Sequence, residues 1–154
     1  MGSHRSITTL LFDWDGTLID TASQGLAAFQ KTFAELGVKF DHDLYEASYS
    51  PNWYQTYAAI GLPKEKWQQA DDLWLQHYGQ ESAVLIEGAS ETILGLHGKG
   101  YCLGVVSSGS HSRVTREIDE SGLSSIFQVV ICNEHITNKK PHPEGLEKAL
   151  LGVE

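Results

Sequence analysis

The chain has 154 residues, 41% of them hydrophobic and 20% charged, a balance that is typical of a folded globular domain and excludes a disordered protein. Its formal net charge is −9 at pH 7, which argues against nucleic-acid binding because that function needs a basic surface to neutralise phosphates. The sequence contains no run of about 18 apolar residues, so no membrane span is predicted.

The first predicted element is a short buried strand over 7–12 (ITTLLF), because this run is apolar and β-branched and ends at Asp13. A helix is predicted from Thr21, where apolar residues recur at helical spacing until Gly37 provides a stop. Residues 40–82 continue as helix-like segments that are rich in aromatic residues.

From about residue 85 the pattern becomes an alternation of helices and strands. The predicted elements are a helix over 90–100, a strand over 101–107, a helix over 112–123, a strand over 127–132 and a helix over 143–152. This order predicts a parallel sheet with right-handed crossovers. We therefore expect an α/β core formed by residues 1–20 and 85–154, with a helical insertion over 21–84.

Two aspartates follow the first predicted strand. Asp13 and Asp15 are two residues apart, so in extended chain their carboxylates point to the same side, at the strand end where open parallel sheets bind ligands. Carboxylates this close need a cation, and hard oxygen ligands suit Mg²⁺. Gly16 permits a tight turn directly after them. The alternative is an Asp-Gly turn with no functional role.

Polar residues also follow the other two predicted strands. Ser107 and Ser108 end the second strand, where their hydroxyls could hydrogen-bond a phosphate or simply cap the next helix. Lys140 lies in a loop stiffened by two prolines after the third strand. Its ammonium group could offset the charge of a phosphate and of the aspartates, or remain solvated.

Taken in order, these segments resemble the motifs of the haloacid-dehalogenase-like hydrolase superfamily. The stretch DWDGTLID (13–20) resembles its first motif, DxDGT, Ser107 after GVV its second, and Lys140 in KPHP its third. The insertion is similar to the small helical cap of the phosphoglycolate phosphatase-like subfamily. The resemblance implies a Rossmann-like parallel sheet core with an inserted α-helical cap over 21–84.

The resemblance also implies a mechanism. Asp13 would be the nucleophile that forms an aspartyl-phosphate, and Asp15 the general acid and then the general base. Mg²⁺ would be held by the Asp13 carboxylate and the backbone carbonyl of Asp15. The residues placed around the phosphate and the nucleophile loop are Ser107, Ser108, Lys140, Thr17 and Gly16.

The expected function is that of a cytoplasmic, Mg²⁺-dependent phosphatase for a small phosphorylated metabolite such as phosphoglycolate. The acid at Asp15 favours a phosphatase over a dehalogenase, since a halide leaving group needs no proton. A sugar-phosphate mutase of the same superfamily and a non-catalytic module remain as alternatives.

The family continues after the helix at 143–152 with a strand and further metal-binding carboxylates, a fourth motif that this sequence does not contain. We therefore expect an incomplete core, as in a portion of a longer enzyme, with little activity on its own. The strand over 7–12 would then have an unpaired apolar edge, open to self-association.

Two groups of residues are expected to be structural. Cys102 and Cys132 lie in separate apolar stretches without a CxxC pair, which predicts buried thiols in a reducing cytoplasm. The aromatic residues of the insertion are expected to pack its helices together rather than to bind substrate. They are Trp53, Tyr54, Tyr57, Trp67, Trp74 and Tyr78.

Overall fold

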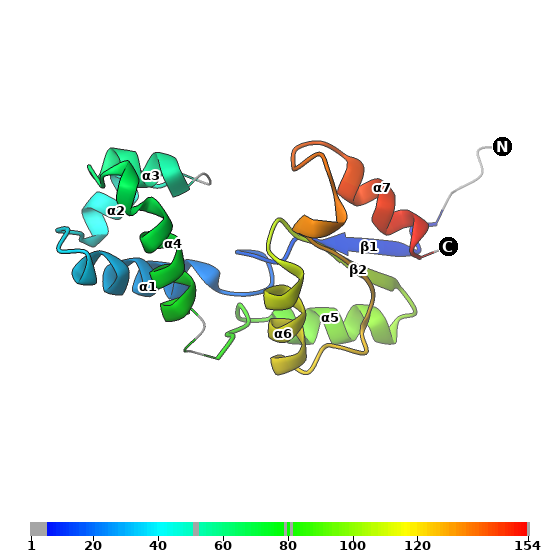
Figure 1. Ribbon diagram of the computed structural model, residues 1–154. Coiled ribbons are helices and arrows are strands. Elements are labelled where there is room, and N and C mark those ends of the chain that lie inside the picture. The colour runs from blue at the N-terminus through cyan, green and yellow to red at the C-terminus, as the bar shows by residue number, and fades with distance from the viewer. Residues whose placement is uncertain (1–5, 51–52, 79, 81, 154) are drawn as a thin grey trace. The chain divides into compact units, whose positions relative to one another are not determined.

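The computed structural model of the protein describes residues 6–50, 53–78, 80 and 82–153 (Figure 1). The chain divides into two compact units, one formed by residues 1–21 and 82–154 and the other by residues 22–81. Each unit has its own hydrophobic core, and each is described by itself.

The first unit is built on a parallel sheet of strands β1 (Thr9–Phe12), β2 (Cys102–Val106) and β3 (Phe127–Ile131), in the order β1-β2-β3. Phe12 lies beside Val105, and Val105 lies beside Val130, so the carboxyl ends of the strands meet at one edge. The predicted α/β fold class is confirmed, and each predicted strand is present with small differences at its ends.

Helices cover both faces of this sheet. They are α5 (Ala89–Gly98), α6 (His111–Glu120) and α7 (Glu144–Leu151), with a 3₁₀ turn η2 (Asn133–His135). Figure 1 shows α7 on one face and α5 and α6 on the other. A Cβ atom on Gly145 would lie 2.9 Å from Cγ1 of Val106, so α7 packs closely against the end of β2. This contact fixes the loop before α7, which carries Lys140.

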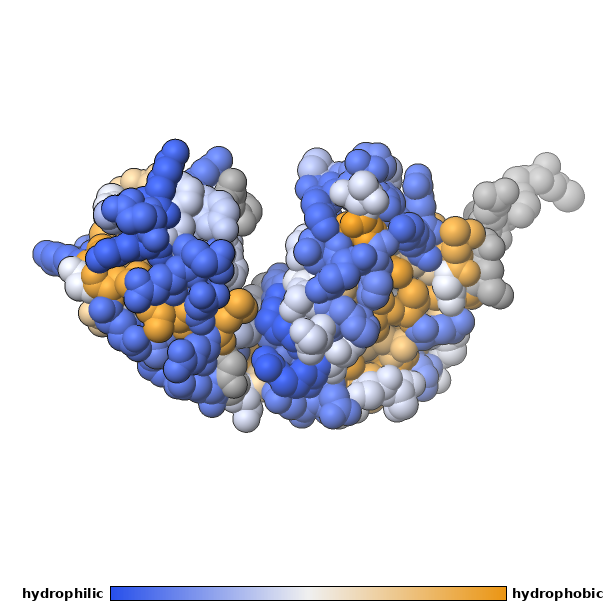
Figure 2. Space-filling view, viewed as in Figure 1, coloured by the Kyte–Doolittle hydropathy of each residue, from blue (hydrophilic) through white to orange (hydrophobic). Residues whose placement is uncertain are grey.

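Strand β1 lies at one side of the sheet. Among the described residues it pairs with β2 alone, and all four of its residues are half-buried. Figure 2 shows apolar surface on this unit around β1 and α7. The exposed large hydrophobic residues there are Ile7, Leu146, Leu150 and Leu151. An edge strand with apolar neighbours can pair with another chain.

The second unit is a small helical bundle around an aromatic core. Its elements are α1 (Thr21–Glu35), α2 (His42–Ser48), α3 (Trp53–Ala59), the 3₁₀ turn η1 (Lys64–Lys66) and α4 (Trp67–Tyr78). Phe29 stacks on Phe33 at 5.6 Å between ring centroids, and Trp74 lies 4.2 Å from Trp53. The aromatic residues of this unit thus pack its helices, as predicted, although Tyr54 is 45% exposed.

The two cysteines are free thiols with different surroundings. Cys132 is buried, whereas Cys102 is half-buried and its thiol donates to Oε1 of Gln128 at 2.7 Å. The prediction of a buried thiol is therefore wrong for Cys102, because the first residue of β2 lies at the rim of the sheet. Within the described ranges, no helix combines the length and the apolar character that a membrane crossing requires.

Candidate active site

The carboxyl edge of the sheet brings together residues from all three strand ends. Asp13 follows β1, Ser107 follows β2, and Lys140 lies on the loop after β3. Nζ of Lys140 lies 2.9 Å from Oδ1 of Asp13 and donates to the backbone carbonyl of Val106, also at 2.9 Å. The parallel register thus places a carboxylate and an ammonium in contact although 127 residues separate them.

A tight turn presents the two aspartates. Trp14 between them is fully buried, so the alternation of side chains turns Asp13 and Asp15 away from the core. The backbone N–H of Gly16 donates to Ile19 at 3.0 Å, and that of Leu18 donates to Trp14 at 3.0 Å. Gly16 has a φ of 72°, in the left-handed region that glycine adopts without strain.

Asp13 is the more accessible of the two carboxylates. Its side chain is 47% exposed, and that of Lys140 is 40% exposed, so a ligand from solvent can reach both groups of this ion pair. The backbone N–H of Trp14 also donates to Oδ1 of Asp13 at 2.9 Å. Both contacts use the same oxygen, so Oδ2 accepts neither of these hydrogen bonds.

Asp15 has a cation of its own, which sequence reasoning missed. Arg113 of α6 donates from Nη1 to Oδ1 of Asp15 and from Nη2 to Oδ2, each at 2.8 Å. Arg113 also pairs with Glu117 one turn later, and Glu117 accepts from Nε1 of Trp14 at 2.7 Å. In the sequence, the i, i+4 spacing of Arg113 and Glu117 on a predicted helix indicates that these two side chains can pair.

The serines after β2 have different environments. Ser107 is 2% exposed, accepts from the backbone N–H of Gly109 at 3.0 Å, and directs its hydroxyl toward Oδ2 of Asp15 at 3.5 Å. Ser108 is exposed, as is Thr17. For Ser108 and Thr17, no side-chain hydrogen bond to Asp13, Asp15 or Lys140 occurs in the part of the chain that the structure describes. Ser110 is the N-cap residue of α6, and its side chain makes no capping bond.

The loop that carries Lys140 is held by the first turn of α7. The Glu144 carboxylate accepts from the backbone N–H groups of Thr137 at 3.0 Å and Asn138 at 2.7 Å. These two hydrogen bonds lower the pKa of Glu144 to about 2. Nζ of Lys139 donates to the backbone carbonyl of Asn133 at 2.7 Å, which ties the same loop to η2.

The oxygen donors at the site fit magnesium in kind. They are the carboxylate of Asp13 and the backbone carbonyl of Asp15, since the side chain of Asp15 is paired with Arg113. Mg²⁺ commonly binds through one or two protein oxygens and completes its shell with waters and substrate phosphate. No group of three His, Cys, Asp or Glu side chains suited to a metal occurs within residues 6–50, 53–78, 80 and 82–153.

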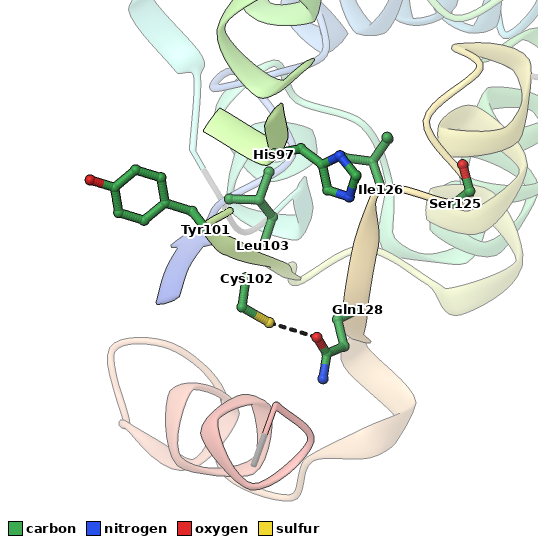
Figure 3. Close-up of a pocket in the computed structure, with 7 residues that line it drawn as sticks. All are labelled: His97, Tyr101, Cys102, Leu103, Ser125, Ile126 and Gln128. Atoms are coloured by element: carbon green, nitrogen blue, oxygen red, sulfur yellow. Dashed lines mark hydrogen bonds between the residues drawn. The ribbon is translucent and has the colours of Figure 1, made fainter. Parts of the chain in front are cut away.

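A shallow pocket of about 280 Å³ lies at the opposite, amino-terminal end of the strands (Figure 3). It is lined by His97, Tyr101, Cys102, Leu103, Ser125, Ile126 and Gln128. Open parallel sheets bind ligands at the carboxyl ends of their strands, and the charged groups described above lie there. The chemistry therefore places the candidate site at the carboxyl edge and not in this pocket.

Comparisons with known proteins show which family and which fold the chain is similar to. Residues 10–153 match the family model described as haloacid dehalogenase-like hydrolase. The pyrophosphatase PpaX of Listeria monocytogenes is 34% identical over 148 residues, which cover 94% of this chain and 68% of the relative.

Two solved structures share the fold. A predicted phosphoglycolate phosphatase from Haemophilus somnus superposes with a TM-score of 0.78 at 17% identity, covering 92% of this chain and 69% of that one. CbbY from Rhodobacter sphaeroides, in complex with phosphate, superposes with a TM-score of 0.72 at 24% identity, covering 96% and 73%. At these identities the structures establish a shared fold.

Proposed function

Since the chain belongs to the haloacid dehalogenase-like hydrolase family, we propose that it is a Mg²⁺-dependent phosphatase that acts through an aspartyl-phosphate at Asp13. The observation that carries this proposal is the exposed carboxylate of Asp13, held 2.9 Å from the ammonium of Lys140 at the carboxyl edge of the sheet. Asp15 lies two residues later on the same turn, and we assign to it the roles of proton donor and then proton acceptor.

In the first step, Oδ2 of Asp13 attacks phosphorus and the bond from phosphorus to the ester oxygen breaks. The electron pair of that bond stays on the ester oxygen, which takes a proton from Asp15 and leaves as a neutral alcohol. The products are the aspartyl-phosphate and the Asp15 carboxylate. Lys140 stabilises the charge on the phosphoryl oxygens during this transfer.

In the second step, the Asp15 carboxylate takes a proton from water while the water oxygen attacks phosphorus. The bond between phosphorus and Asp13 breaks, and its electrons return to the Asp13 carboxylate. Inorganic phosphate leaves, and Asp15 is again protonated. Mg²⁺, held by the Asp13 carboxylate and the backbone carbonyl of Asp15, would supply charge neutralisation between the anionic carboxylate and the anionic phosphate.

The substrate we propose is a small phosphomonoester of the phosphoglycolate type. The similarity to PpaX favours pyrophosphate as a second candidate, since that relative is named a pyrophosphatase. We assign substrate selection to the helical unit of residues 22–81, which occupies the place of an inserted cap in the chain. The expected setting is the cytoplasm, in keeping with two free thiols.

The test is phosphate release by the purified full-length protein, with phosphoglycolate, pyrophosphate and an aryl phosphate as substrates. We expect activity that requires Mg²⁺, is abolished by a chelator, and is lost in Asp13→Asn with an unchanged melting temperature. Acid quenching with ³²P-labelled substrate should trap label on the wild-type protein and not on Asp13→Asn. Phosphate release that persists in Asp13→Asn would refute the nucleophile assignment.

We also propose self-association through the free edge of β1, with a second copy of the chain as the partner. The apolar residues around β1 and α7 support this pairing. Sedimentation velocity over a range of concentrations should show a dimer that is weakened by Thr9→Lys, which places a charge on the edge. A monomer at all concentrations would rule this contact out.

A further inference from the structure

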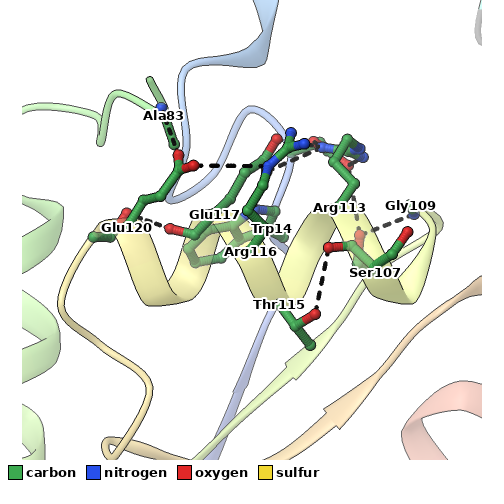
Figure 4. Close-up of polar contacts among 12 residues, drawn as sticks. Trp14, Ala83, Ser107, Gly109, Arg113, Thr115, Arg116, Glu117 and Glu120 are labelled. Carbon is green, nitrogen blue, oxygen red and sulfur yellow. Dashed lines mark hydrogen bonds and ion pairs between the residues drawn. The ribbon is translucent and has the colours of Figure 1, made fainter. Parts of the chain in front are cut away.

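A closed set of contacts connects the nucleophile turn with α6. We call Trp14, Asp15, Arg113 and Glu117 the Asp15 network. Nε1 of Trp14 donates to Glu117 at 2.7 Å, and Arg113 donates to Glu117 at 3.1 and 3.2 Å (Figure 4). Arg113 also donates twice to Asp15, each time at 2.8 Å. The peptide bond between Trp14 and Asp15 closes the ring.

Burial makes this network rigid. The exposed fraction is 0% for Trp14 and 2% for Glu117, and the Arg113 side chain is 18% exposed. A buried carboxylate is costly unless it is paired and hydrogen-bonded, so Glu117 holds Arg113 in one place. Arginine presents a planar fork whose two parallel N–H groups match both carboxylate oxygens, so Arg113 in turn fixes the orientation of Asp15.

The network leaves Asp13 out. The proposed nucleophile pairs with Lys140, which lies on a different loop. The two aspartates are therefore paired with cations from different elements, Lys140 from the loop after β3 and Arg113 from α6.

We propose that Arg113 is the positioning residue for Asp15 and that Glu117, anchored by Trp14, holds Arg113 in that role. The inference rests on the proposed function, because it assumes that Asp15 delivers the proton to the leaving oxygen. Arg113 contacts neither substrate nor phosphorus in this role, and it acts only through the orientation of Asp15.

The leaving group provides a selective readout. An alkyl phosphate releases a strongly basic oxygen and needs the proton from Asp15, whereas p-nitrophenyl phosphate releases a stable anion and does not. A misplaced Asp15 should therefore slow the alkyl ester far more than the aryl ester. The value of kcat/KM isolates this first step, because it covers events up to the first cleavage of the ester bond.

The experiment compares Arg113→Gln, Arg113→Lys and Asp15→Asn with the wild type in the full-length protein, with phosphoglycolate and p-nitrophenyl phosphate as substrates. We expect Arg113→Gln to lower kcat/KM about 10- to 100-fold for phosphoglycolate and about threefold or less for the aryl ester. Arg113→Lys keeps the charge without the fork and should recover part of the loss. Asp15→Asn should also lower kcat/KM more for phosphoglycolate than for the aryl ester, and by a larger factor than Arg113→Gln does.

Arg116→Gln is the matched control. Arg116 lies on the same helix, is 46% exposed, and pairs with Glu120 at 3.8 Å. Its loss should leave kcat/KM for both esters within about twofold of the wild type, since exposed pairs contribute little. The melting temperature of each variant is measured to check that it folds. If Arg113→Gln does not fold, Arg113→Lys tests the role of Arg113 in its place.

The outcomes separate the two proposals. Suppose first that Asp15→Asn lowers kcat/KM selectively for phosphoglycolate. The role of Arg113 is then overturned if the Arg113 variants lower kcat/KM equally for both esters, do not lower it, or raise it. A wild-type protein that hydrolyses neither ester would overturn the proposed function and the inference with it. A wild type that is active while Asp15→Asn shows no selectivity would remove Asp15 as the acid, and Arg113 would then have no catalytic partner to position.

Discussion

Two carboxylates at one strand end repel each other, and this protein supplies each with a separate cation. Asp13 pairs with Lys140 from the loop after β3, and Asp15 pairs with Arg113 from α6. Arg113 also donates to Glu117, so this one cation lies between two carboxylates. Individual residues thus make the crowded turn stable before any substrate binds.

At this scale Lys140 is expected to be essential. Lys140→Met removes the charge beside Asp13 and the hydrogen bond to the Val106 carbonyl, so kcat/KM for phosphoglycolate should fall about 100-fold or more. Steady-state kinetics on the full-length protein measure this. Lys139→Met is the matched control, because the side-chain hydrogen bond of Lys139 goes to the backbone carbonyl of Asn133 in η2. Equal losses of kcat/KM in both variants would show that these lysines act by holding the loop in place, and not through the contact of Lys140 with Asp13.

Glu144 should give the loop a pH-dependent stability. Two backbone hydrogen bonds lower its pKa from 4.5 to about 2, so the folded state favours the carboxylate. The stabilisation is fully present above about pH 4.5 and is lost as the pH falls toward 2. Melting temperatures of wild type and Glu144→Gln should differ at pH 7 and converge near pH 2.

The exposed Glu147 on the same helix provides the control for that series. Glu147→Gln should shift the melting temperature little at any pH, because no backbone hydrogen bond to that carboxylate is present in the described part of the chain. A Glu144→Gln difference that is constant from pH 7 to pH 2 would contradict the assignment.

Among the elements, β2 is the one on which the site depends. It lies between β1 and β3, and its end supplies both Ser107 and the carbonyl that anchors Lys140. Gly104 at its centre lets the neighbours approach, since a Cβ atom there would lie 2.6 Å from Cγ1 of Val129 and 2.8 Å from Cδ2 of Leu11. The glycine is therefore needed for packing rather than for an unusual backbone angle.

Gly104→Ala should lower the free energy of unfolding by about 1–3 kcal/mol through overpacking. Gly95→Ala in α5 is the matched control, because nothing lies within 4 Å of a Cβ atom there and alanine favours a helix by up to about 1 kcal/mol. Urea denaturation of both variants measures the difference. An unaffected Gly104→Ala protein would mean that Val129 and Leu11 adjust without cost.

The elements were largely predictable from the sequence, and their side-chain partners were not. Apolar and β-branched runs that end at polar residues identify all three strands, and parallel strand ends bring Asp13, Ser107 and Lys140 together. Arg113 was missed because it and Asp15 are 98 residues apart in the sequence. Their contact also depends on which side of α6 lies toward the turn after β1. Cys102 was predicted to be buried because its neighbours in the sequence are apolar. It is the first residue of β2, and this position at the rim of the sheet leaves it half-buried.

At the scale of the whole molecule, the protein has two separate hydrophobic cores. The core of residues 22–81 contains Trp74, which stacks on Tyr78 at 4.6 Å and donates to the Gly25 carbonyl at 3.3 Å. The other core contains Val105 of β2. Separate cores allow one unit to open locally while the other remains folded.

Trp74→Ala should therefore destabilise one unit selectively. We expect a loss of about 3–5 kcal/mol in the stability of residues 22–81, because a large side chain is removed from a packed core. Hydrogen exchange should be faster in α1 and α4 and unchanged in β2. Val105→Ala should give the reverse pattern, and equal acceleration in both units for either variant would mean that they unfold together.

The hydrogen bond from Trp14 to Glu117 has a consequence for how such sequences can diverge. Replacing Trp14 by phenylalanine would leave the buried Glu117 carboxylate with one donor fewer, so the change is tolerated only if Glu117 also becomes neutral or smaller. Arg113 would then lose its own anchor. The three positions should accordingly covary across an alignment of relatives, as one inherited unit that spans 103 residues of sequence.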